Sequence, residues 1–452
     1  MTKRKRLNPA AKITLGYLVV LLIGTLLLCL PVSSVDGKWF SFVDSLFTST
    51  SAISVTGLVV VDTATHFSIF GQIVILLLIQ IGGLGFITLT SLVFLIVGKK
   101  ITYKSRVAIQ ESLNQENVQG MVKLVKKVII FVFVVEFFGF LCLAPSFVSI
   151  YGWSGGLFKA LFMSISAFCN SGMDVVGTNP LVMSSLSIFS QNVLVLLPLI
   201  FLIIIGGLGY VVIFDLCGIF KKRKMSLHSK VVIVLTGILL GGGVLLYAFL
   251  EWNNPATIGG KTIGEKIINV LFQSTTTRTA GFSTFDLGGL TTPSIVLTCF
   301  LMFIGGSPAS TAGGIKTTTL LLLLLAIFKN TNTKGDIVFR KRKISNRVIQ
   351  KCLRVVCSAI LLVAISTFLI CLFESGGVSV TQSCFESISA ISTTGLSMGI
   401  TSSLTIGSKL VLVLLMFTGR VGAVTLTVAI GNRNVGSVSD DISYPDSKIM
   451  VG

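Results

Sequence analysis

The sequence has few acidic side chains and almost no histidine: 17 Asp and Glu and two His among 452 residues. His66 and His228 are far apart, and the nine cysteines form no C-x-x-C pair, so neither a zinc site nor a disulfide framework is indicated. Walker and dinucleotide-binding sequences are also missing, and no polar stretch is long enough for a soluble catalytic domain. We therefore expect no enzyme activity, no catalytic residue, no covalent cofactor and no functional histidine.

The chain is instead rich in apolar sequence, with 52% hydrophobic residues, 12% charged residues and a mean hydropathy of +0.93. This composition is typical of an integral membrane protein. We interpret the apolar run after MTKRKR as a retained helix, because it is longer than a signal core and no Ala-x-Ala-like site follows it. Runs of roughly 20 apolar residues predict eight transmembrane helices, beginning near Ile13, Phe67, Val128, Leu186, Val231, Ser294, Val355 and Ser408.

The basic residues are confined to alternate connectors between these apolar runs. Four segments contain 26 of the 36 Lys and Arg: residues 1–12, 99–127, 221–230 and 329–354. The positive-inside rule places these segments and both termini in the cytoplasm. The net charge of +19 is split into short clusters beside membrane ends, which suits anionic lipid headgroups or an acidic partner and argues against nucleic acid.

One polar motif occurs four times. Each copy begins with Phe, continues through a Ser- and Thr-rich run and ends in Gly followed by an apolar residue. The copies are FTSTSAISVTGL (47–58), FMSISAFCNSGM (162–173), FQSTTTRTAGF (272–282) and FESISAISTTGL (385–396). The third copy is one residue shorter, and every copy lies between two apolar runs on the side away from the basic connectors.

These copies predict an all-α polytopic membrane protein with four parallel helix/pore-loop/helix repeats around a central pore. Parallel repeats suit a ring with pseudo-fourfold symmetry better than the inverted repeats of rocking transporters. Irregular backbone at membrane depth must be buried or line a wet cavity, where its carbonyls can replace the water around a cation. The predicted repeats are residues 1–98, 99–220, 221–328 and 329–431, followed by a cytoplasmic tail, 432–452.

The motif set resembles the Trk/Ktr/HKT superfamily of potassium transport proteins, and most closely the KtrB-type membrane subunit of bacterial Ktr systems. The similarity extends through the four polar segments, IQIGGLGF, GGSPASTAGGIK, TGRVGA and the tail YPDSKIMVG. It implies a potassium uptake channel in the bacterial plasma membrane, a homodimer joined through its C-terminal tail, and a cytosolic ring of nucleotide-binding RCK subunits. It also implies potassium as the permeant ion, stimulation by sodium, and potassium selectivity, since all four segments keep glycine.

On this resemblance, four tripeptides form the selectivity filter with their backbone carbonyls. They are Val55, Thr56 and Gly57; Asn170, Ser171 and Gly172; Thr279, Ala280 and Gly281; and Thr393, Thr394 and Gly395. No two tripeptides are identical, so selectivity is expected to be less strict than in a fourfold filter. An ion-coupled transporter for potassium or sodium with alternating access is the alternative function.

The apolar run from Ser294 to Phe328 is too long for one spanning helix. Its Gly-, Pro-, Ser- and Thr-rich middle predicts two half-helices joined by a gate loop, Gly305–Lys316, rather than a long tilted helix with a Pro kink. Gly313 and Gly314 are the expected hinge, and the gate residues are Gly305, Gly306, Gly313, Gly314, Lys316 and Arg420. Lys316 is expected to anchor the loop.

Charged residues near the pore have competing interpretations. We expect Arg420 to face the lumen and bond the gate loop, although a pair with Glu136 or Asp215 is the alternative. We expect Arg278 to brace the third filter segment through backbone carbonyls rather than to pair with an outer acid. Four outer acids either concentrate cations at the entrance or are ordinary loop carboxylates: Asp44, Asp62, Asp174 and Asp286.

Overall fold

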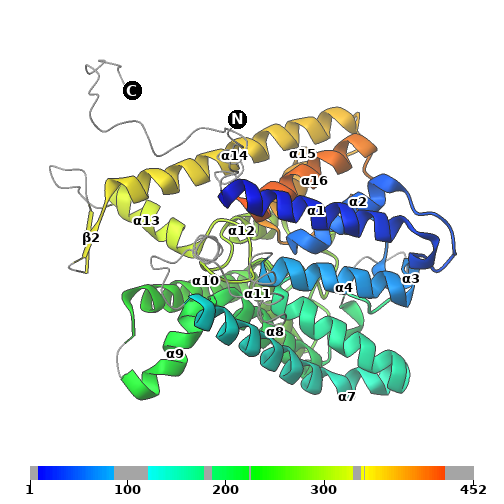
Figure 1. The fold of residues 1–452 in the computed structure, drawn as a ribbon, viewed down its shortest axis with the longest axis horizontal. Helices are drawn as coiled ribbons and strands as arrows, with labels where there is room; N and C mark the ends of the chain where they lie inside the picture. Colours follow the sequence, from blue (N-terminus) through cyan, green and yellow to red (C-terminus); the bar gives the residue numbers. More distant parts are fainter. Residues whose placement is uncertain are drawn as a thin grey trace, which may run out of the picture.

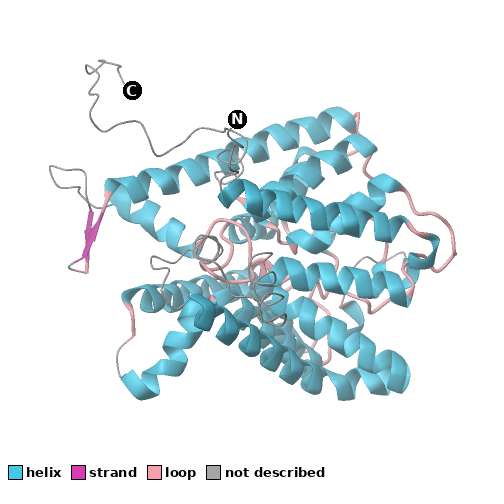
Figure 2. Cartoon of the chain, viewed as in Figure 1, coloured by secondary structure: helices cyan, strands magenta, loops and turns pink. Residues whose placement is uncertain are grey.

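The computed structural model describes residues 9–85, 121–177, 186–222, 225–328, 337–340 and 342–422. Within these ranges the chain is mostly helical, and several loops gather near the centre of the molecule (Figures 1 and 2). Residues 99–120 of the basic connector 99–127, and the tail 432–452 with its predicted dimer contact, lie outside the described residues.

The first two repeats contain seven described helices. They are α1 (Pro9–Cys29), α2 (Phe42–Ser54), α3 (Thr63–His66), α4 (Ile69–Leu84), α7 (Met121–Cys169), α8 (Val193–Leu208) and α9 (Tyr210–Lys222), with 3-10 turns η1 (Pro31–Ser33) and η2 (Ser187–Phe189). Helix α7 is interrupted at Gly152, where φ is 76°. Its second part is therefore the counterpart of α2.

The last two repeats contain the remaining described elements. They are α10 (Leu227–Glu251), α11 (Ile263–Thr276), η3 (Leu287–Gly289), α12 (Thr292–Phe303), α13 (Thr317–Phe328), α14 (Asn346–Phe373), α15 (Val380–Ser392), η4 (Thr401–Ser403) and α16 (Ile406–Val421). A small antiparallel hairpin, β1 (Ile337–Phe339) with β2 (Arg342–Ile344), precedes α14. It is a departure from the purely helical prediction.

Several helices are long and apolar enough to cross a membrane. By length and composition, three described segments qualify: Val122–Cys169, Leu227–Glu251 and Asn346–Phe373. A fourth span is possible if α8 and α9, which meet at 99°, are counted together. Shorter apolar helices occupy other predicted positions, in α1, α4, α12 and α13, so the number of eight crossings stays a prediction.

The outer face of the bundle is apolar, as a lipid-facing surface requires. Phe249, Phe368 and Phe138 are 85%, 67% and 62% exposed. A soluble protein rarely exposes so much aromatic surface, so these side chains support placement in a bilayer.

The same serine contact joins pore helix to first helix in three repeats. The hydroxyls of Ser49, Ser164 and Ser274, each two residues after the Phe of its motif, donate to the carbonyls of Leu21, Glu136 and Leu240. Gly24, Gly139 and Gly243 lie three residues after those carbonyls, and a Cβ there would collide with the serine hydroxyl. In the fourth repeat the corresponding Ser387 hydroxyl has no hydrogen-bond partner. The pore helices are thus positioned by a polar contact that small residues permit.

The repeats pack in chain order and the last returns to the first. Helix α4 packs on α7, α8 on α11, α12 on α15, and α16 on α2. Each second helix therefore contacts the pore helix of the next repeat, and the described helices close into a ring.

Candidate ion pathway

The four predicted filter segments share one backbone conformation. Their first residues have left-handed φ values: 57° at Val55, 59° at Asn170, 70° at Thr279 and 51° at Thr393. Their glycines also have positive φ: 95° at Gly57, 71° at Gly172, 84° at Gly281 and 88° at Gly395. Positive φ is costly for residues with a Cβ. Its recurrence at matched positions in four segments indicates a shared geometric requirement.

The four glycines lie against one another in a closed circuit. A Cβ built on Gly57 would lie 3.1 Å from the Cα of Gly172, and one on Gly172 would lie 2.8 Å from the Cα of Gly281. A Cβ on Gly281 would lie 3.3 Å from the Cα of Gly395, and one on Gly395 would lie 2.9 Å from the Cα of Gly57. The structure thus brings all four segments together around one axis, with no room for side chains at the glycines.

Pore-helix hydroxyls support these segments. The amides of Gly57 and Gly395 donate to the hydroxyls of Ser51 and Ser389, at 3.0 and 3.1 Å. In the other two segments the hydroxyl donates instead: Ser166 bonds the carbonyl of Met173 at 2.5 Å, and Thr276 bonds that of Phe282 at 2.6 Å.

Sequence reasoning missed these four supporting hydroxyls. Each is the fourth residue after the Phe that begins its motif. This shared position, with Ser or Thr in all four copies, is the sequence pattern that could have identified them. The spacing from hydroxyl to glycine is six residues in three copies and five between Thr276 and Gly281. This locates the one-residue deletion of the third copy after its pore helix.

The predicted break in residues 294–328 is present. Helix α12 ends at Phe303 and α13 begins at Thr317, so the alternative of one kinked helix is wrong. A parallel bridge between Ile304 and Ile315 closes the base of the gate loop. The two ends of the gate loop lie close together at this base, because a Cβ on Gly305 would lie 3.0 Å from the Cα of Gly314.

The gate loop touches two filter segments directly. A Cβ on Gly313 would collide with the Thr393 hydroxyl and lie 3.1 Å from the Ser392 carbonyl. On the opposite side of the ring, the Thr311 hydroxyl lies 3.2 Å from the side-chain amide of Asn170 and 3.1 Å from the carbonyl of Phe168. The loop is therefore seated against the second and fourth segments.

Other parts of the gate loop bind α8. The amides of Thr311 and Ser307 donate to the carbonyls of Gly206 and Gly207, at 3.2 and 3.0 Å. At Gly306 a Cβ would lie 3.2 Å from the same Gly207 carbonyl. These contacts fix the loop to the second repeat.

Arg420 connects three elements. Its guanidinium donates to the Thr311 carbonyl in the gate loop, at 2.6 Å, and to the Gly82 carbonyl in α4. Among the residues that the structure describes, no ion pair joins Arg420 to Glu136 or Asp215, its alternative partners. Glu136 accepts from Gln80 at 3.1 Å, and Asp215 accepts from Ser229 at 2.6 Å. Within the described residues, the hydrogen bonds of Arg420 are therefore to peptide carbonyls.

Lys316 binds the loop from its C-terminal end. Its ammonium group donates to the carbonyl of Ala312 at 2.7 Å, with the carbonyl of Gly313 at 3.5 Å. The gate loop is thus held by two cationic side chains that bond its carbonyls.

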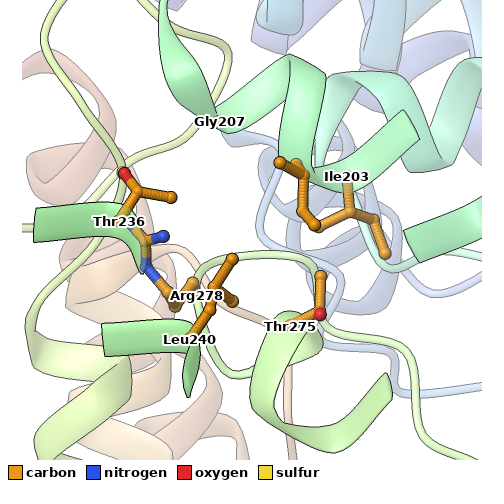
Figure 3. A pocket seen from close by; sticks show the side chains of 8 residues that line it. Ile203, Gly207, Thr236, Leu240, Thr275 and Arg278 are labelled. Atoms are coloured by element: carbon orange, nitrogen blue, oxygen red, sulfur yellow. The ribbon is translucent and has the colours of Figure 1, made fainter. Parts of the chain in front are cut away.

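Arg278 does not make the expected bracing contacts. Its side chain is 8% exposed, yet no hydrogen bond from its guanidinium to a carbonyl or carboxylate occurs in the described part of the chain, and its Nε has no partner. The physical reason is the local backbone. Helix α11 ends at Thr276, and the turn that follows directs the Arg278 side chain between α8 and α10 (Figure 3).

The outer acids mostly have local structural partners. Asp44 forms an ion pair with Lys409 at 2.7 Å, and Asp62 and Asp286 accept from the amides of Ala64 and Gly288. These contacts favour the interpretation as ordinary loop carboxylates.

Asp174 differs from the other outer acids. It is half-buried two residues beyond Gly172, in the loop that leaves the second filter segment, and it accepts from the Val176 amide at 3.0 Å. Burial raises its pKa to about 7, with the charge of Asp62 raising it further and Lys159 lowering it. Its charge therefore changes near neutral pH.

Comparison with known proteins agrees with this arrangement. The model of the TrkH family, described as cation transport protein, matches residues 8–434. The chain belongs to the TrkH cation transport protein family. The resemblance predicted from the sequence motifs is therefore confirmed, and the chain is a membrane ion transport protein rather than a member of an enzyme class.

Two relatives in this family match nearly full length. Ktr system potassium uptake protein B of Bacillus subtilis is 38% identical over 447 residues, covering 99% of this chain and 97% of the relative. Potassium/sodium uptake protein NtpJ of Enterococcus hirae is 36% identical over 456 residues, covering 99% and 98%.

A solved structure shows the same fold. The potassium transporter TrkH from Vibrio parahaemolyticus aligns with a TM-score of 0.70 and 18% identity, over 92% of this chain and 84% of that one. A mostly helical fold like that of TrkH is thus confirmed, while the pseudo-fourfold arrangement of eight crossings stays a prediction.

Proposed function

We propose that this protein is the membrane subunit of a potassium uptake system and conducts potassium through the four filter segments. The circuit of four touching glycines carries this proposal, because it brings four backbone segments to one axis. Rings of carbonyl oxygens replace an ion's hydration shell without fixed charge, so a cation can enter and leave. Potassium is the transported substrate, and its ligands are the carbonyls of the twelve filter residues.

The gate loop blocks this pathway until it moves. Its seat against Thr393 and Asn170 puts it directly at the filter, and Arg420 and Lys316 hold its carbonyls. Moving the loop must break hydrogen bonds to charged donors, which contribute about 1.5–3 kcal/mol each. This cost keeps the pathway closed unless a regulator supplies the energy.

Regulation in trans is part of the proposal. The relative in Bacillus subtilis is named as part of a Ktr system, and the Enterococcus hirae relative is named for potassium and sodium. These names support a partner system and an involvement of sodium, which we assign as an activator. The motif resemblance alone supports a homodimer on a cytosolic RCK ring that binds nucleotides. Multi-pass placement in the plasma membrane with cytoplasmic termini completes the proposal.

The test is potassium and sodium uptake in a bacterium that lacks its own potassium transporters. Gly57→Ser and Gly395→Ser each place a side chain where φ is positive and neighbouring backbone is in contact. We expect the preference for potassium over sodium to fall about tenfold, equivalent to about 1.4 kcal/mol. Gly264→Ser is the matched control, since its Cβ would meet open space. Unchanged ion preference in both filter variants would contradict the assignment.

A further inference from the structure

A cavity lies behind the third filter segment, between the second and third repeats. It is lined by Ile203, Ile204 and Gly207 of α8, Thr236 and Leu240 of α10, Thr275 of α11, Arg278, and Gly306 of the gate loop. Figure 3 shows the side chains of Arg278 and Thr236, which both line this cavity. The remaining walls are aliphatic or glycine, apart from Thr275. It has room for about one water-sized group.

Two polar groups at this cavity are buried without partners. Arg278 and Thr236 are 8% and 6% exposed, and the Arg278 Nε and the Thr236 hydroxyl have no hydrogen-bond partner. The Thr275 hydroxyl is occupied, because it donates to the Leu271 carbonyl at 2.8 Å. The lining therefore presents unsatisfied donors and no carboxylate.

An uncompensated guanidinium is costly in such a place. Arginine stays protonated in proteins, and burying a charge without a partner costs several kcal/mol. A water molecule in the cavity would accept a hydrogen bond from one donor, but it would not neutralise the positive charge of Arg278. A small anion would satisfy both donors and cancel the charge, whereas a phosphate or carboxylate ligand exceeds the available space.

We propose that Arg278 and Thr236 form a binding site for one small monovalent anion of halide size. Arg278 directly precedes Thr279, the first residue of the third filter segment, so its positive charge opposes a cation in the filter. A bound anion offsets this charge and raises the affinity of the filter for potassium. This second effect rests on the proposed function, whereas anion binding does not.

The binding test uses bromide as the probe. Crystals of the protein grown with bromide in place of chloride are expected to show an anomalous peak within hydrogen-bond distance of the Arg278 guanidinium and the Thr236 hydroxyl. Thr236→Val, which removes the hydroxyl at nearly constant volume, should weaken the peak, and Arg278→Gln should abolish it. Thr367→Val on α14 is the control. A cavity that holds only water, or a peak unaffected by either variant, would overturn the site.

The transport test separates the site from its effect. Protein in liposomes is assayed for potassium uptake in chloride and in gluconate, an anion too large for the cavity. The wild-type protein is expected to need about threefold more potassium for half-maximal uptake in gluconate than in chloride, equivalent to about 0.7 kcal/mol of potassium-binding free energy. Thr236→Val should reduce this difference between the two anions. An equal requirement in both anions would overturn the effect on the filter. A bromide peak in a protein without potassium uptake would contradict the proposed function and leave the site standing.

Discussion

At the scale of single residues, two cationic side chains bond peptide carbonyls of the gate loop. Arg420 joins α16 to the gate loop and to α4, and it does so with the planar donor pattern that lysine lacks. Arg420 lies in the last turn of α16, and a charge in an apolar membrane segment usually faces a partner or water. Here the partners are the carbonyls of Thr311 and Gly82, so the arginine acts on the position of the loop.

Replacing Arg420 should release the gate loop. Arg420→Ala removes both hydrogen bonds, and Arg420→Lys keeps the charge without the ability to bond both carbonyls at once. We expect Arg420→Ala to raise potassium uptake without the regulatory partner about tenfold, since hydrogen bonds to a charged group contribute about 1.5–3 kcal/mol each. Uptake rate in vesicles measures this, with exposed Arg354→Ala as the control. Unchanged uptake would count against a gating role.

Asp174 should make uptake depend on pH. Its pKa of about 7 lies above the ordinary value, so the carboxyl is neutral in acid and gains its charge as pH rises through 7. The raised pKa also means that its contribution to folding stability is largest below the unfolded pKa of about 3.9 and is lost as pH rises through 7.

The charged form of Asp174 should concentrate cations near the filter. Two unit charges roughly 6 Å apart interact by about 0.7 kcal/mol at the dielectric constant of water, which corresponds to about a threefold change in local cation concentration. We expect uptake at low potassium to rise about threefold between external pH 6 and 8, and Asp174→Asn to abolish the rise. Asp286→Asn is the matched control. If potassium uptake by Asp174→Asn depended on pH in the same way as uptake by the wild type, a group other than Asp174 would be responsible for the pH dependence.

At the scale of elements, the gate loop depends on glycine at one contact. Gly313 lies where a Cβ would press on the Thr393 hydroxyl and the Ser392 carbonyl. Gly313→Ala should therefore displace the loop from the fourth filter segment and raise basal uptake, whereas Gly260→Ala, with open space around its Cβ, should not. Single-channel recording measures the open fraction. An open fraction equal to wild type in Gly313→Ala would show that the loop does not close by this contact.

Elements of the pathway that depend on local sequence could be predicted. The break between α12 and α13 follows from its Gly, Pro, Ser and Thr content, and the four pore segments follow from one motif repeated in register. Helix starts were less accurate: the run predicted near Leu186 begins as a helix only at Val193, because the Asn192 side chain caps it there. Capping decides such boundaries more than hydropathy does.

Contacts between distant elements could not be predicted from the sequence. The environment of Arg278 depends on α8 and α10 folding beside its turn, and hydropathy gives no information on which helices become neighbours. The Thr311 contacts with Asn170 and Gly206 likewise require the loop to be seated in three dimensions. The sequence predicted the residue types at the pathway and left their partners open.

At the scale of the whole molecule, function depends on the ring remaining closed. Consecutive repeats are joined by the chain, whereas the fourth repeat returns to the first through the Arg420 hydrogen bond to the Gly82 carbonyl of α4 and through packing of α16 on α2. Lys409 of α16 and Asp44 of α2 form an ion pair at this contact, 365 residues apart in the sequence. A loss of this contact would separate the first and fourth filter segments.

The ion pair between Lys409 and Asp44 should therefore stabilise the closed ring. Their side chains are only 13% and 23% exposed, so solvent screens the pair less than a surface ion pair. We expect Asp44→Asn and Lys409→Gln each to lower the free energy of unfolding by about 1 kcal/mol. The double variant should lose less than the sum, because removing one partner already abolishes the interaction. Thermal unfolding of the purified protein in detergent measures all four proteins, and strictly additive losses would show that the pair does not hold the first and fourth repeats together.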